Sequence, residues 1–97
     1  MTLALDFDGT FTEDPDMWRS FIRSAQLRGH TVICATGRKE WTDDMARYGL
    51  PEIPIVYCWG MMKEEACRKA GYSINVWIDD CPGMIQNCLL IGEDKDL

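Results

Sequence analysis

The acidic residues of this chain include two close pairs, and each pair directly follows an apolar run. Asp6 and Asp8 come after the first apolar run of the sequence, and Asp79 and Asp80 come after a later one. Carboxylates placed so close together repel one another unless a positive charge lies between them. Mg²⁺ prefers oxygen ligands, so the two pairs predict a divalent cation site.

Hydrolysis of a phosphate monoester is a reaction that such residues could perform. It requires charge neutralisation, an attacking oxygen in line with the leaving group, and a proton for the leaving alkoxide. Asp6 could attack phosphorus and form an aspartyl phosphate. Asp8, two residues further along an extended chain, could protonate the leaving oxygen and later activate water. We expect the carboxylates of Asp6 and Asp79 and the backbone carbonyl of Asp8 to hold Mg²⁺, with Asp80 in support.

Three further residues could bind the transferring phosphoryl group. Thr36 offers a hydroxyl, Gly37 a backbone N–H, and Lys63 a positive charge for the phosphate and for Asp6. Each assignment has a structural alternative. Thr36 could be an ordinary strand-end threonine, and Lys69 could take the place of Lys63. The Asp79-Asp80 pair could cap the following helix, a role that suits Asp80 in particular.

Residues at the rim of such a site would contact the rest of the substrate. Arg38 could bind the phosphate, or it could pair with Glu40 or a neighbouring acid. Trp59 begins a Trp-Gly-Met-Met run that could stack a base, although such clusters more often belong to a core or a dimer contact. The remaining predicted rim residues are Glu13, Trp41, Met61, Met62 and Cys81.

The elements that must position these residues alternate between strands and helices. Apolar runs predict strands at 3–5, 31–35, 55–58, 74–78 and 89–91, and helical spacing predicts helices at 15–28, 43–48, 63–70 and 82–87. Strands without polar alternation, separated by helices, are typical of a parallel sheet that is buried on both faces. We therefore expect a small doubly wound α/β fold, a three-layer α/β/α sandwich. Ligands bind beyond the carboxyl ends of such strands, where both acidic pairs and Thr36 fall.

Four sequence elements, in this order, resemble the haloacid dehalogenase superfamily of phosphohydrolases. They are residues 6–10 (Asp-Phe-Asp-Gly-Thr), residues 35–38 (Ala-Thr-Gly-Arg), Lys63 and residues 78–80 (Ile-Asp-Asp). The resemblance covers residues 3–91 and implies the family's Rossmannoid fold, Mg²⁺ and an aspartyl-phosphate intermediate.

The segments where many relatives carry a cap domain are short in this chain. Residues 11–14 follow the first motif, and residues 37–62 have room for only a helix, a strand and loops. The resemblance thus implies a minimal, capless type. Its open site would suit a nucleotide, a phosphorylated end of a macromolecule, or a small substrate closed in by a second subunit, which makes a homodimer an expected partner.

Two alternatives to a phosphatase follow from the same residues. The receiver domains of response regulators also combine acids, a threonine and a lysine, but their acceptor aspartate lies at a later strand than the acid pair. The order found here disfavours that class. The second alternative is a catalytically weak module on the same fold, which would bind or sequester a phosphorylated metabolite or nucleotide.

Composition limits the remaining possibilities. The chain has 97 residues, 46% of them apolar, which predicts a single domain over 1–97 with a frayed tail at 92–97. A net charge of -6 disfavours general binding to nucleic acid. The sequence has no apolar run of about 20 residues and no basic leader, so we expect no membrane partner and a cytoplasmic location. Five cysteines without a C-x-x-C pair are expected to be reduced thiols.

Overall fold

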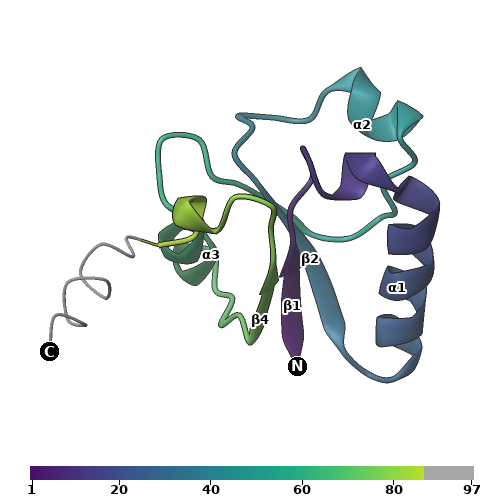
Figure 1. Cartoon of the computed structure of the whole chain (residues 1–97). Helices are drawn as coiled ribbons and strands as arrows, with labels where there is room; N and C mark the ends of the chain where they lie inside the picture. Colours follow the sequence, from purple (N-terminus) through teal and green to yellow (C-terminus); the bar gives the residue numbers. More distant parts are fainter. Residues whose placement is uncertain (87–97) are drawn as a thin grey trace, which may run out of the picture.

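Four parallel strands form the sheet of this protein, seen in the computed structural model, which describes residues 1–86 (Figure 1). The strands are β1 (Thr2–Leu5), β2 (Thr31–Thr36), β3 (Ile55–Tyr57) and β4 (Val76–Ile78), in the spatial order β3-β2-β1-β4. All three pairings are parallel. The predicted α/β class is thereby confirmed, while the predicted strand at 89–91 and the tail at 92–97 lie outside the described residues.

Helices connect the strands, as the sequence predicts. They are α1 (Pro15–Leu27), α2 (Asp43–Arg47) and α3 (Lys63–Lys69), with short 3-10 helices η1 (Phe11–Glu13) and η2 (Pro82–Met84). Asp14 caps α1, since its Oδ1 accepts a hydrogen bond from the backbone N–H of Met17 at 3.2 Å. Thr42 precedes α2 but makes no capping bond, and its hydroxyl instead contacts Asp44 and Arg38.

Two predicted elements are shorter in the structure by two residues or more. The helix expected at 82–87 is a 3-10 turn that ends at Met84, because Gly83 is a poor helix former, and residue 87 lies outside the described residues. The strand expected from residue 74 begins only at Val76. Just before β4, Asn75 donates its backbone N–H to the carbonyl of Thr2 at 2.8 Å, and its side-chain Oδ1 accepts the backbone N–H of Thr2 at 2.8 Å.

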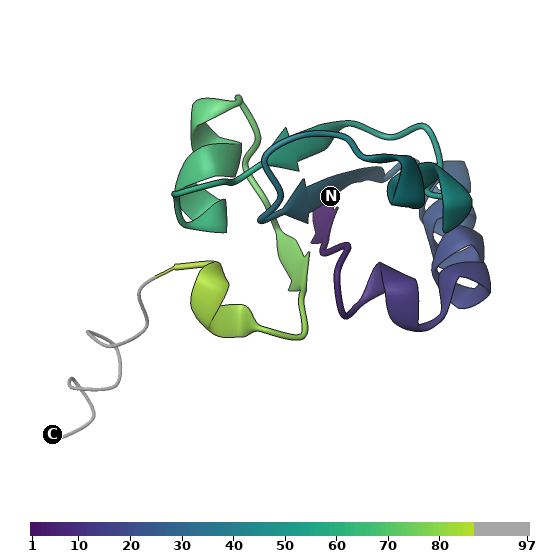
Figure 2. The same cartoon turned by 90° about the horizontal axis from the view of Figure 1, so that it is seen from above.

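The helices cover the two faces of the sheet (Figures 1 and 2). Alternate residues of each strand point to opposite faces. On one face Leu3, Leu5, Val32 and Cys34 pack with α1 and with Met45 of α2. On the other face the intervening strand residues pack with α3; they are Ala4, Ile33, Ala35 and Val56. The central strands are thus buried on both sides, as predicted, whereas β4 at the edge is only half-buried.

The order of the strands decides where the polar residues meet. The chain builds the sheet outward from β1 to β3 and then returns to place β4 on the other side of β1. Such a reversal opens a crevice at the carboxyl ends of the two strands that flank it. The backbone N–H of Asp6 donates to the carbonyl of Ile78 at 2.9 Å, which brings the two acidic pairs to one edge.

Two further observations concern predictions made from composition. Within residues 1–86 no helix is both long and apolar enough to cross a membrane. The four cysteines in that range, Cys34, Cys58, Cys67 and Cys81, are free thiols.

Candidate active site

A buried lysine joins two of the acidic residues. Lys63, the first residue of α3, donates from Nζ to Asp6 Oδ1 at 2.7 Å and to Asp79 Oδ2 at 2.6 Å. All three side chains are at most 7% exposed. Lys69, the alternative, is exposed near the end of α3 and lies 3.4 Å from Glu65. Lys63 is therefore the lysine that reaches the carboxyl ends of the strands.

Thr10 links Asp6 to the fourth acidic residue, Asp80. Its Oγ1 lies 3.1 Å from Asp6 Oδ2 and 3.2 Å from Asp80 Oδ1, and it accepts the backbone N–H of Asp80 at 3.2 Å. A hydroxyl has one proton, so it donates to only one of the two carboxylates at a time. Sequence reasoning gave Thr10 no role, although its place in the first motif was the available signal.

The turn after β1 brings the backbone close to Asp80. Gly9 has φ +84°, and a Cβ at this position would lie 2.5 Å from Asp80 Oδ2. A side chain at residue 9 would thus meet both an unfavourable backbone conformation and a carboxylate. Glycine is required here because the turn and the acidic cluster are in direct contact.

Burial and charge alter the protonation of the cluster. Burial is the main cause that raises the pKa of Asp6 to about 6, and hydrogen bonding with Asp80 adds to it while Lys63 opposes it. The same hydrogen bond lowers the pKa of Asp80. Burial opposes the charged form of Lys63, but its bonds to Asp6 and Asp79 prevail and raise its pKa. Lys63 is therefore an ammonium at neutral pH.

The cluster fits a divalent cation by charge and by donor type. Oxygens of Asp6, Asp79 and Asp80 all lie within 4.8 Å of one another. When ionised, these three carboxylates face one ammonium, which leaves two negative charges unbalanced. Asp6 and Asp79 each keep one oxygen that does not contact Lys63. Hard oxygen donors with an excess of two negative charges suit Mg²⁺.

Asp8 has a different environment from Asp6. Residues 7–10 form a turn, so the chain is not extended between the two aspartates, and the alternation that predicted their common orientation does not apply. The Asp8 carboxylate instead binds Arg38 through both oxygens, at 2.8 Å to Nε and 2.7 Å to the guanidinium NH2 group. It is not part of the Asp6–Asp79–Asp80 cluster. Between the two aspartates, Phe7 is fully buried and anchors the turn.

Arg38 pairs with acids, which was one of its two predicted roles. Besides Asp8, it binds both oxygens of Asp44 at 2.7 and 2.8 Å, and its Cζ lies 4.9 Å from the ring centre of Phe7. These bonds raise the pKa of Arg38 and lower that of Asp44. Asp44 on α2 is a second residue that sequence reasoning missed, because its partner lies in the preceding loop.

The loop after β2 carries the predicted phosphate ligands. Thr36 is fully buried at the end of β2, and its Oγ1 accepts the backbone N–H of Arg38 at 3.2 Å. Gly37 is exposed, with no atom within 4 Å of where a Cβ would stand. The hydroxyl of Thr36 thus shapes this loop, and open space lies over Gly37.

An apolar pocket lies beside this loop. It has a volume of about 540 Å³ and is lined by Gly37, by residues 58–62, by Glu65 of α3 and by Met84 of η2. Trp59 is 68% exposed, so it does not belong to the core. Of the other predicted rim residues, Met61 and Met62 line this pocket, while Glu13 lines a different hollow beside Asp79 and Asp80.

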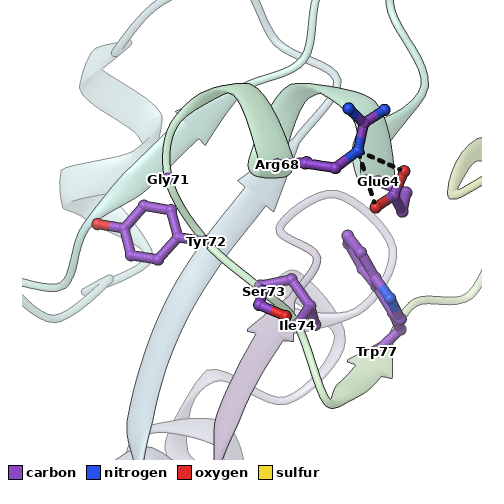
Figure 3. Close-up of a pocket in the computed structure, with 7 residues that line it drawn as sticks. All are labelled: Glu64, Arg68, Gly71, Tyr72, Ser73, Ile74 and Trp77. Atoms are coloured by element: carbon purple, nitrogen blue, oxygen red, sulfur yellow. Dashed lines mark hydrogen bonds and ion pairs between the residues drawn. The ribbon is translucent and has the colours of Figure 1, made fainter.

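A further pocket lies away from the acidic cluster. It measures about 310 Å³ between the end of α3 and β4, where Arg68 pairs with Glu64 above Trp77 (Figure 3). None of the predicted site residues lines it. It is therefore not part of the candidate active site.

Comparisons with known proteins give no further guide. No family model, no curated protein and no solved structure matches this chain.

Proposed function

We propose that this protein is a Mg²⁺-dependent phosphomonoester hydrolase that acts through an aspartyl-phosphate intermediate. The observation that carries the proposal is the contact of Lys63 with Asp6 and Asp79, beside Asp80, at the carboxyl ends of β1 and β4. A buried carboxylate beside a fixed ammonium and a cation site is what transfer of a phosphoryl group requires. The proposal also assigns the chain to the haloacid dehalogenase superfamily, which its four sequence elements resemble, and to that family's three-layer fold without a cap domain.

The chemistry would proceed in two steps. An oxygen of Asp6 forms a bond to phosphorus while the bond to the leaving oxygen breaks, and the leaving alkoxide takes a proton from Asp8. Water then attacks the phosphorus, gives a proton to Asp8, and releases inorganic phosphate and free Asp6. Bound Mg²⁺, held by Asp6, Asp79 and Asp80 with the carbonyl of Asp8, would neutralise phosphoryl charge. Lys63 has three N–H donors, two of which bind Asp6 and Asp79, and the third can bind a phosphoryl oxygen.

The hydrogen bonds between the Asp8 carboxylate and Arg38 must break before Asp8 can donate a proton to the leaving group. In the structure both oxygens of the Asp8 carboxylate accept hydrogen bonds from the Arg38 guanidinium. A phosphate dianion competes with Asp8 for Arg38, while Asp44 keeps the guanidinium in place through two bonds of its own. Substrate binding would thus release Asp8 for acid–base chemistry, and it gives Arg38 its second predicted role.

The Asp8–Arg38 pair also favours a second candidate function. If Asp8 stays bound to Arg38, the site lacks a free acid but keeps its phosphate-binding groups. The protein would then be a module that binds a phosphorylated metabolite or nucleotide with little turnover. Phosphate-ester binding with micromolar affinity and no hydrolysis would favour this function.

Hydrolysis of p-nitrophenyl phosphate tests the enzyme. We expect activity that requires Mg²⁺ and that falls by several orders of magnitude in Asp6→Asn, because an amide is a far weaker nucleophile and a poorer metal ligand. Asp16→Asn is the matched control, since Asp16 is an exposed residue of α1 that pairs with Arg19. Wild-type-like hydrolysis by Asp6→Asn would refute the mechanism.

A further inference from the structure

We infer that the apolar pocket beside Gly37 binds the leaving group of the substrate, and that this group carries a planar heterocycle with N–H donors, as nucleotides do. The inference rests on the proposed phosphatase function. It names the substrate class for that site.

The pocket borders the loop that carries the predicted phosphate ligands Thr36 and Gly37. Gly37 belongs to both, because it lines the pocket and directly follows Thr36. The backbone N–H of Cys58 donates to the carbonyl of Thr36 at 2.7 Å, which joins the two loops that form the pocket wall. Met62 lines the pocket, and the next residue is Lys63, whose ammonium contacts Asp6. A phosphate bound at the backbone of Gly37 would have this pocket beside its ester group.

The lining of the pocket suits a flat aromatic group. Trp59 is 68% exposed and offers an indole ring, and three methionines also line the pocket, Met61, Met62 and Met84. Indole rings stack on heterocycles, and thioethers make favourable contacts with aromatic edges. A volume of about 540 Å³ lies within the range of small-ligand sites.

A carboxylate in the pocket lining favours ligands that carry hydrogen-bond donors. Among the described residues, Glu65 is the one carboxylate that lines the pocket, and it can accept hydrogen bonds from ring or exocyclic N–H groups. An aliphatic chain could not use this acceptor, which in the structure pairs with the exposed Lys69 at 3.4 Å. The hollow on the other side of the cluster is less suitable, because Glu13, Asp14, Asp79 and Asp80 all line it.

The experiment compares adenosine 5′-monophosphate with ribose 5-phosphate, which differ only in the base. We expect wild-type kcat/KM to favour the nucleotide by roughly tenfold or more, the range expected for one stacked base. In Trp59→Ala this preference should disappear, and in Trp59→Phe most of it should remain, because phenylalanine keeps an aromatic face. Leu27→Ala is the control, since Leu27 is an apolar residue at the end of α1 that is 79% exposed and lies outside the pocket lining. It should keep the wild-type preference.

The outcomes separate this inference from the proposed function. Hydrolysis of both esters at equal kcat/KM, or a preference that survives in Trp59→Ala, would overturn the base pocket and leave the phosphatase intact. If neither ester is hydrolysed, the proposed function fails, and equilibrium dialysis with the same two ligands tests the pocket alone. The wild type could also be a dimer that dissociates in Trp59→Ala while the ligand preference stays the same. That result would show that the surface binds a second copy of the chain, and it would overturn the inference.

Discussion

Lys63 balances more buried negative charge than any other single residue of the site. Its ammonium lies between Asp6 and Asp79, and none of the three side chains is more than 7% exposed. A buried ion group of this kind is costly to break, because the remaining charges lose both water and their partner. Lys63 therefore contributes to the stability of the fold as well as to the proposed chemistry.

Lys63→Met should destabilise the protein by about 3–5 kcal/mol, since it leaves two carboxylates buried without a counter-ion. Lys69→Met removes a lysine from the same helix whose partner Glu65 is exposed, so its cost should stay within about 1 kcal/mol. Urea unfolding followed by circular dichroism measures both. Equal losses of stability in the two variants would contradict the role of Lys63 in the cluster.

At the scale of elements, the turn between β1 and η1 is the segment on which the cluster depends most. It buries Phe7 against the core, directs Asp6 toward Lys63, and brings Gly9 against Asp80. Thr10 completes the turn by contacting both Asp6 and Asp80. The geometry of this turn and that of the cation site are therefore coupled.

Gly9→Ala and Gly29→Ala separate backbone strain from contact with the cluster. Both glycines have similar positive φ, +84° and +86°, so alanine should cost about 1–2 kcal/mol at either position. At Gly29 a Cβ meets nothing within 4 Å, whereas at Gly9 it meets Asp80. We expect Gly9→Ala to cost more in urea unfolding and to weaken Mg²⁺ binding in calorimetry. Equal stability and equal Mg²⁺ affinity in the two variants would show that the turn and the cluster are independent.

For the whole molecule, the site exists only when the sheet is assembled. Asp6 and Asp79 come from adjacent strands that are far apart in sequence, and Lys63 comes from the helix that packs on one face. Any cation bound there stabilises the folded state alone, because the unfolded chain does not bring these oxygens together.

Mg²⁺ should therefore raise the melting temperature of the wild type, by an amount equivalent to about 2.7 kcal/mol at a concentration of 100 times Kd. Asp79→Ala should lose most of this stabilisation, because it removes one of the three clustered carboxylates. Asp8→Asn should keep it, since its side chain lies outside the cluster, yet slow turnover by roughly 10²–10⁴-fold through loss of the acid–base group.

Differential scanning calorimetry with MgCl₂, against NaCl of equal ionic strength, measures the stabilisation of each variant. Equal loss in Asp79→Ala and Asp8→Asn would contradict the division between metal ligand and acid. A wild-type shift of the same size in NaCl would indicate charge screening in place of a cation site.

The sequence by itself determined the order and type of the elements. Apolar runs without polar alternation predicted buried parallel strands, and helical spacing predicted the start of α1 at Pro15. These signals are local, because an apolar run and a helical spacing are each complete within a few residues of sequence. The predicted strand ends also indicated which polar residues could lie close together. The same local signals misplaced the start of β4, which is Val76 and not residue 74.

The tertiary structure alone decided which of these residues come together. Placing β4 beside β1 brings Thr10 to Asp80 across 70 positions of sequence, and no local pattern carries that pairing. The turn at residues 7–10 places Asp8 against Arg38, which also binds Asp44, whereas an extended chain would have kept Asp8 beside Asp6. Long-range contacts of this kind depend on strand order and loop path. Spacing along the chain does not encode either directly, because many loop paths connect the same elements.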